Sequence, residues 1–224
     1  MAGELVLFDL DNTLLEGDSD EEWLEFLIAE EALDRDTEFA AKERLMRRYR
    51  EGAAGAIEFC EFFLRSYVPH SMERLLAWRE RFVRERILPR VSAAARELIA
   101  AHRRELCLII TATNRFLTEP IAAELGVPNL IATEPEIEQG RFTGRVAGTP
   151  CFREGKIERL AGWLAGRGKS AEDFPIVRFY SDSINDAPLL ERATHPVAVD
   201  PDPRLERLAL ERGWPVLRLR RRAA

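Results

Sequence analysis

Cysteine is scarce in this chain of 224 residues, and long apolar runs are missing. The chain has an odd number of cysteines, namely Cys60, Cys107 and Cys151. They lie far apart in sequence and form no Cys-x-x-Cys pair. This pattern indicates reduced, mostly buried thiols and argues against a disulfide framework or a zinc site. No stretch reaches the roughly 20 apolar residues of a membrane span, and the first residues read as a strand instead of a signal peptide. We therefore expect a cytoplasmic protein with no membrane span.

An excess of positive charge is also missing. The formal net charge is −6 at pH 7, which argues against nucleic acid as a partner. The exception is a basic C-terminal tip that contains Arg218, Arg220, Arg221 and Arg222. We expect this tip to be a solvated tail, with a surface anchor as the alternative. Apolar residues make up 46% and charged residues 32% of the chain, as in a globular protein.

Glycine and proline are sparse from residue 16 to residue 88, where helix formers dominate. Apolar side chains such as Trp23, Leu24 and Leu27 recur there at helical spacing, which predicts a bundle of about four helices. The bundle opens with Asp18 and a run of acids, the composition of a capped helix start. The same acids would equally suit a substrate contact. We expect residues 16–88 to form a helical domain of their own.

The remaining segments, 1–15 and 89–224, alternate short apolar runs with helical patterns. This alternation predicts an α/β core domain with a Rossmann-like parallel sheet and helices on both faces. Three apolar runs read as buried strands at 5–8, 106–110 and 174–180. Further expected strands are at 129–132, 196–199 and 214–217, with a β-hairpin at 137–146. Helices are expected at 91–101, 116–125, 155–164 and 205–210, and from Leu189-Leu190 onward.

Polar side chains follow the three buried strands where each of them ends. The first strand is followed by Asp9 and Asp11, the second by Thr111, Thr113 and Asn114, and the third by Asp182, Asn185 and Asp186. Ligands of parallel α/β sheets bind at this end of the strands. The hydroxyl and amide groups among these residues can donate hydrogen bonds to a phosphoryl group. Lys156, at the start of the helix before the third strand, can add a positive charge.

The gathered acids would repel one another by about 4 kcal/mol for each pair in contact. Mg²⁺ would offset that repulsion, because it prefers carboxylate and phosphate oxygens. The residues therefore predict a magnesium and phosphate site.

Together these residues resemble the four ordered motifs of the haloacid dehalogenase-like hydrolases, in the phosphoserine phosphatase-like branch. The motifs are Asp9-Leu10-Asp11-Asn12-Thr13, Thr111, Lys156 and Ser181-Asp182-Ser183-Ile184-Asn185-Asp186. The helical segment 16–88 resembles the cap domain of that branch.

The resemblance implies a set of metal and acid roles. Asp9 would be the nucleophile and a Mg²⁺ ligand, and Asp11 would be the general acid and base, with its backbone carbonyl on the metal. Asp182 would bind Mg²⁺ directly, whereas Asp186 would support the metal through its waters.

The resemblance also implies substrate contacts. Thr111 would hold the phosphoryl group, Lys156 would neutralise Asp9 and the phosphate, and Asn185 would line the phosphate site. Asp18 resembles in position the acid that phosphoserine phosphatases use to bind the amino group of their substrate.

The predicted function is hydrolysis of a small phosphorylated metabolite by a Mg²⁺-dependent phosphomonoesterase, through an aspartyl phosphate. A substrate similar to phosphoserine or histidinol phosphate is favoured. Thr111-Ala112-Thr113 replaces the usual Ser-Gly-Gly, and Ser181-Asp182-Ser183 the usual Gly-Asp-Gly, which weakens the case for phosphoserine itself. Alternatives are a phosphotransferase or mutase, a lipid-phosphate phosphatase, and a signalling module that only accepts phosphate. Asp11 beside Asp9 favours turnover, because a group that speeds hydrolysis gives a switch no advantage.

Overall fold

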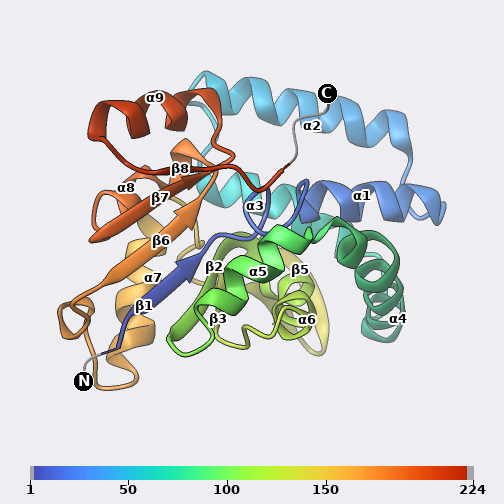
Figure 1. The fold of residues 1–224 in the computed structure, drawn as a ribbon. Coiled ribbons are helices and arrows are strands. Elements are labelled where there is room, and N and C mark those ends of the chain that lie inside the picture. Colours follow the sequence, from blue (N-terminus) through green and yellow to red (C-terminus); the bar gives the residue numbers. More distant parts are fainter. Residues whose placement is uncertain (1–2, 221–224) are drawn as a thin grey trace.

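A six-stranded parallel sheet forms the centre of the molecule in the computed structural model, which describes residues 3–220 (Figure 1). The strand order is β3-β2-β1-β6-β7-β8. The strands are β1 (Leu5–Phe8), β2 (Leu106–Asn114), β3 (Leu130–Thr133), β6 (Val177–Ser181), β7 (His195–Val199) and β8 (Val216–Leu217). Leu5 of β1 pairs with Leu106 on one side and with Val177 on the other, so β1 is an inner strand. The predicted α/β fold is confirmed.

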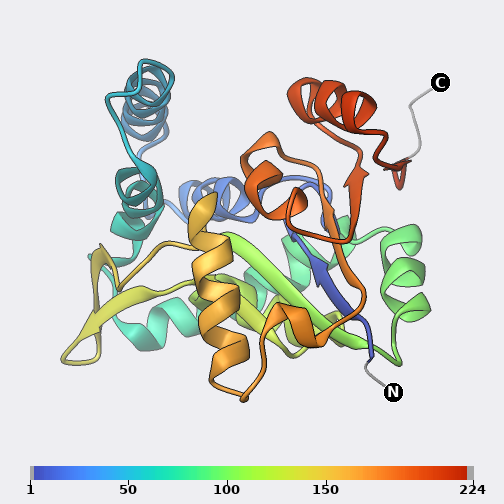
Figure 2. The ribbon, with the colours of Figure 1, turned by 90° about the vertical axis from the view of Figure 1, so that its left-hand side faces the viewer.

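Helices cover both faces of the sheet because the side chains of β1 alternate between two apolar clusters. Val6 and Phe8 belong to one cluster, and Leu5 and Leu7 to the other. The first face packs against α5 (Ala93–Ala101) and α6 (Arg115–Glu124). The second packs against α7 (Glu154–Ala165), α8 (Ala187–Leu190) and α9 (Pro203–Arg212). Figure 2 shows α7 in front of the sheet.

Four α-helices lie between β1 and α5, as predicted. They are α1 (Ser19–Ala29), α2 (Arg35–Arg50), α3 (Ala56–Leu64) and α4 (Met72–Phe82). Short helical turns complete this segment at η1 (Arg65–Tyr67), η2 (Val83–Ile87) and η3 (Leu88–Arg90). Three of the four helices begin at a residue whose side chain accepts a backbone N–H, namely Asp18, Asp34 and Ser71.

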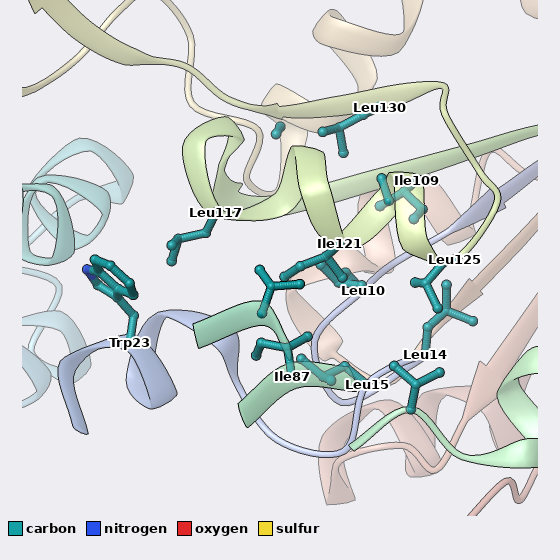
Figure 3. Packing of buried hydrophobic residues seen from close by; sticks show 14 of the residues in the cluster. Leu10, Leu14, Leu15, Trp23, Ile87, Ile109, Leu117, Ile121, Leu125 and Leu130 are labelled. Carbon is teal, nitrogen blue, oxygen red and sulfur yellow. The ribbon is translucent and has the colours of Figure 1, made fainter. Parts of the chain in front are cut away.

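The helical segment is attached to the sheet through a shared apolar core. Trp23 of α1 and Phe82 of α4 lie in the same cluster as Phe8 of the sheet. Figure 3 shows Trp23 facing this cluster near Leu117 of α6. Helices α2 and α3 instead meet in a smaller cluster, which contains Leu45, Phe62 and Phe63 together with Leu24 of α1. In Figures 1 and 2 the arrow of β1 points toward the end of the molecule where α1 and α3 lie.

The predicted hairpin is present as β4 (Pro135–Glu138) and β5 (Arg141–Val146), which pair antiparallel. It contacts the helical segment, since the backbone N–H of Val146 donates to Glu61 of α3 at 3.2 Å.

The prediction for helix α8 was wrong. We expected it to begin at Leu189-Leu190, but it ends there. Turn η5 (Ile184–Asp186) leads directly into α8, and Pro188 fits the first helical turn because the N–H it lacks would be unpaired there. A further short turn, η4 (Ala171–Asp173), precedes β6.

The described part of the basic tip is anchored to the protein and is not a free tail. Arg218 forms an ion pair with Glu206, and Arg220 donates to the backbone carbonyl of Asn12. Arg221 and Arg222 lie outside the described residues. Within residues 3–220, no helix combines the length and the apolar character needed to cross a bilayer.

Candidate active site

A buried lysine joins two of the predicted acids. The Nζ of Lys156 donates to Asp9 Oδ1 at 2.8 Å and to Asp186 Oδ2 at 2.7 Å. The Lys156 side chain is 2% exposed. A cation in the first turn of α7 opposes the helix dipole, and these two carboxylates supply the compensating charge. Ser181, the last residue of β6, also donates to Asp186, at 2.7 Å.

The charges at this junction alter each other's pKa values. Burial raises the pKa of Asp9 to about 7, although Lys156 opposes this shift. Burial by itself would lower the pKa of Lys156, but the carboxylates of Asp186 and Asp9 outweigh it and raise that pKa. Lys156 therefore remains a cation inside the protein.

Thr13 links Asp9 to Asp182 across the end of the sheet. Its hydroxyl lies 3.3 Å from Asp9 Oδ2 and 3.2 Å from Asp182 Oδ1, and it accepts the backbone N–H of Asp182 at 3.0 Å. Burial, and next the nearby charge of Asp9, raises the pKa of Asp182 to about 8. Our sequence reasoning did not give Thr13 a role. The only signal was its place in the first motif, because the partner is 169 residues away in sequence.

Asp11 is held by a hydrogen bond to each of its carboxylate oxygens. Oδ1 accepts the backbone N–H of Ser19 at 2.7 Å, and Oδ2 accepts the hydroxyl of Thr113 at 2.8 Å. Burial raises the pKa of Asp11, while these hydrogen bonds act against the shift. The Thr113 hydroxyl is thus directed at Asp11, and the backbone N–H of Thr113 donates to Thr111 Oγ1 at 3.2 Å.

A cavity of about 220 Å³ opens onto these residues. Its lining includes every predicted site residue except Asn114: Asp9, Asp11, Asp18, Thr111, Thr113, Lys156, Asp182, Asn185 and Asp186. The volume is below the 300–1,000 Å³ typical of sites for drug-sized ligands, so the cavity suits a small metabolite.

The Asn114 side chain lies behind the cavity wall. Its Oδ1 accepts the backbone N–H of Leu117 and caps α6, while its Nδ2 donates to Asp20 at 3.1 Å and to the Tyr67 hydroxyl at 3.0 Å. Asn114 therefore holds the side chain of Asp20, which lines the cavity. The contact of Asn114 with the substrate stays a prediction.

Two acids of the helical segment face the cavity. Asp18 lines it and also caps α1, since its Oδ1 accepts the backbone N–H of Glu21 at 3.0 Å. Burial, followed by the charge of Asp11, raises the pKa of Asp18 to about 7. Asp20 lines the cavity as well, and burial, followed by the charge of Asp18, raises its pKa well above the ordinary value. A positive ligand group beside these two acids would favour their ionised form and bind to it, so the pair provides a place for such a group.

Aromatic side chains complete the lining, and sequence reasoning missed them. They are Tyr49 of α2, Phe59 and Phe63 of α3, and Phe152 from the loop before α7. In the sequence, Tyr49, Phe59 and Phe63 look like ordinary helix core, and only the packing of α2 and α3 at this end of the sheet brings them to the cavity. Phe152 lies in a loop and has no pattern in the sequence that would assign it to a site.

The donor set fits a hard cation that keeps much of its water. Asp9 and Asp182 approach the same hydroxyl of Thr13, so both can reach a single small ion. Within residues 3–220, no group of three or more His, Cys, Asp or Glu side chains is arranged to hold a metal by itself. Mg²⁺ commonly binds one or two carboxylates together with waters and substrate phosphate, and it suits this arrangement.

Comparison with known proteins decides the family. Residues 6–191 match the model of the haloacid dehalogenase-like hydrolase family. The chain belongs to this family. Its sequence is also 41% identical to a histidinol-phosphatase of Neisseria meningitidis serogroup C, over 95% of this chain and 97% of that protein.

Two solved structures extend the comparison. A protein with unknown function from Bordetella pertussis Tohama I has 45% identity and a TM-score of 0.91, covering 97% of this chain and 99% of the other. A substrate-bound phosphoserine phosphatase has 20% identity and a TM-score of 0.65, covering 96% and 92%, which shows a shared fold. The chain is also 32% identical to the phosphoserine phosphatase SerB1 of Mycobacterium tuberculosis, over 97% of this chain and 72% of that protein. This haloacid dehalogenase-like hydrolase is therefore a phosphatase of the phosphoserine phosphatase-like branch.

Proposed function

We propose that the protein is a Mg²⁺-dependent phosphomonoesterase that hydrolyses histidinol phosphate, or a closely similar cationic phosphate ester, through an aspartyl phosphate on Asp9. One observation carries this proposal: a carboxylate at the end of β1 that is held by Lys156 and faces a small cavity with acidic walls.

Asp9 supplies the nucleophile. One of its oxygens attacks phosphorus, the bond from phosphorus to the ester oxygen breaks, and the leaving alkoxide takes a proton from Asp11. Water then attacks the phosphorus of the acyl phosphate and gives a proton to Asp11, and Asp9 departs as a carboxylate. A raised pKa lets Asp11 carry this proton, and its hydrogen bonds to Ser19 and Thr113 keep it in place.

The charge on the reacting groups is balanced by a lysine and a bound metal ion in the proposed reaction. Lys156 stabilises the negative charge on Asp9 and on the transferring phosphoryl group, while Thr111 and Asn185 are proposed to contact the phosphoryl oxygens. Asp9, Asp182 and the backbone carbonyl of Asp11 would hold Mg²⁺, with Asp186 behind its waters. The bound ion would neutralise the phosphate and offset the repulsion between these acids.

The charge of the cavity favours a cationic substrate over phosphoserine. Among the described residues that line the cavity, Lys156 is the one cation, and it is already bonded to two carboxylates. The carboxylate of phosphoserine would face Asp18 and Asp20, whereas histidinol phosphate carries an amine and an imidazole and no carboxylate. The similarity to the Neisseria meningitidis histidinol-phosphatase supports the same choice.

Residues 16–88 are proposed to act as a cap domain over a core of residues 1–15 and 89–224. Lining residues from α2 and α3, such as Tyr49 and Phe59, support this assignment. A cap would exclude bulk water from the acyl phosphate and select the leaving group.

The test is phosphate release by the purified protein with Mg²⁺, from histidinol phosphate, phosphoserine and p-nitrophenyl phosphate, with Asp9→Asn as the inactive control. We expect kcat/KM for histidinol phosphate to exceed that for phosphoserine by at least a hundredfold. Preference for phosphoserine would overturn the substrate assignment. An aspartyl phosphate that lasts for minutes would indicate a phospho-accepting module, and transfer to an added alcohol in preference to water would indicate a phosphotransferase.

A further inference from the structure

Three aromatic rings from three different segments meet in the cavity wall. The ring centroids lie 5.6 Å apart for Tyr49 and Phe59, 6.1 Å for Phe59 and Phe152, and 6.4 Å for Tyr49 and Phe152. All three side chains line the cavity, and all three residues are only partly buried. Tyr49 and Phe59 also pack against the apolar cluster that contains Leu45, but the open parts of the three rings face the cavity and its carboxyl groups. An apolar surface left open in this way is typical of a binding site.

The loop that carries Phe152 has a fixed conformation. The backbone N–H of Cys151, which is fully buried, donates to Thr133 Oγ1 at 3.0 Å. Arg153 has a φ of 51°, in the left-handed region. A Cβ on Gly155 would lie 2.1 Å from the carbonyl oxygen of Pro150, so only glycine fits there. The Phe152 ring is therefore presented by a constrained backbone.

Two of these rings already contact one planar cation. The guanidinium carbon of Arg153 lies 5.3 Å from the ring centroid of Tyr49 and 5.3 Å from that of Phe152. Arg153 is exposed, and its Nε donates to Asn185 at 3.2 Å, at the rim of the cavity. Aromatic faces attract cations because of their quadrupole, and the attraction strengthens when the cation is desolvated.

The same cavity therefore combines aromatic faces with the carboxylates of Asp18 and Asp20. An aliphatic amine would bind to the acids alone, and a neutral ring would pack on the aromatic faces alone. A planar heterocycle that carries positive charge uses both.

We infer that Tyr49, Phe59 and Phe152 form a subsite for a cationic nitrogen heterocycle on the leaving group, with imidazolium as the ring of suitable size. This inference deepens the proposed function and rests on it. The rings determine specificity and take no part in the chemical step, which lies at Asp9.

The test measures inhibition by the leaving group alone, so it does not depend on turnover of histidinol phosphate. The reporter is hydrolysis of acetyl phosphate, which has no ring. Histidinol is compared with 2-aminopropanol, which keeps the amine and hydroxyl but lacks the imidazole. We expect histidinol to inhibit the wild type competitively and at least tenfold more tightly than 2-aminopropanol.

Matched variants locate the effect. Phe152→Leu and Phe59→Leu should each weaken inhibition by histidinol about tenfold relative to inhibition by 2-aminopropanol. Phe152→Tyr should retain tight inhibition. Phe39→Leu is the control, since Phe39 is an exposed aromatic of α2 that does not line the cavity.

The outcomes separate the two proposals. If histidinol inhibits no better than 2-aminopropanol, or if Phe152→Leu and Phe59→Leu leave its inhibition unchanged, the subsite assignment is wrong. If histidinol inhibition depends on these rings but histidinol phosphate is not hydrolysed, the subsite stands and the proposed substrate is wrong.

Discussion

Replacing Lys156 with methionine tests the electrostatic centre of the site. Methionine keeps the apolar stem and approximate volume of the side chain and removes its charge. Lys156 is 2% exposed and bonded to Asp9 and Asp186, so the variant leaves two buried carboxylates without their cation. Removing one partner of such a pair costs about 3–5 kcal/mol. That loss is a large part of the 5–15 kcal/mol that stabilises a typical domain.

The stability lost in Lys156→Met should depend on pH, and the direction of this dependence follows from the pKa of Asp9. The folded-state pKa of Asp9 is raised from 3.8 to about 7, so between these values the folded state binds the proton more tightly than the unfolded state. The free energy of unfolding therefore falls as pH rises through this window. Lys156 lowers the pKa of Asp9, so its removal extends the window upward. We expect a larger loss of stability at pH 8.5 than at pH 5.5.

The assay is urea unfolding of the metal-free protein, followed by tryptophan fluorescence at both pH values. Lys169→Met is the matched control, because Lys169 is exposed and should change stability by less than about 0.5 kcal/mol. Lys156→Met should also lack phosphatase activity. A loss below about 1 kcal/mol at pH 8.5, or an equal loss at both pH values, would refute the reasoning.

The remaining predictions concern the reaction and its substrate. Asp9→Asn should keep the circular dichroism spectrum of the wild type but abolish turnover and labelling by beryllium fluoride; more than a few per cent of residual activity would exclude Asp9 as the nucleophile. A chelator should stop phosphate release and Mg²⁺ should restore it, with Ca²⁺ a poor substitute because it takes more ligands in looser geometry; full activity in excess chelator would contradict metal dependence. The Mg²⁺ concentration for half-maximal activity should fall from pH 6 to pH 8, since protons compete for Asp9 and Asp182, whose pKa values are about 7 and about 8; a pH-independent value would exclude these two ligands. Asp18→Asn should raise KM for histidinol phosphate about tenfold, or about 1.4 kcal/mol, with little effect on p-nitrophenyl phosphate; an equal effect on both substrates, with stability lowered by about 1 kcal/mol, would leave Asp18 only its capping role.

The sequence by itself determined the sheet, the polar residues near its strand ends and the family. The predicted end of the second strand at residue 110 was wrong, because β2 continues through Thr111 and Thr113 to Asn114. Apolar runs such as Leu5–Phe8 are local signals, and a parallel sheet places the residues that follow its strands at one edge. Asp9, Asp11 and Asp182 could therefore be assigned to one site before any distance was known. Lys156, which lies at the start of a helix, was assigned to it because of the motif that it resembles. The helices of residues 16–88 were predictable for the same reason, since their periodicity is local.

Only the tertiary structure decided which side chains contact each other in the site. Thr13 reaches Asp182 across 169 positions of sequence, and the Thr113 hydroxyl is directed at Asp11, because the polar ends of β1, β2 and β6 converge in space. The aromatic wall depends entirely on packing. Tyr49 and Phe59 look like ordinary apolar positions in the sequence, because periodicity shows which face of a helix is apolar but not what that face contacts. Phe152 lies in a loop, where no periodic pattern exists, and only the fold brings it to the cavity.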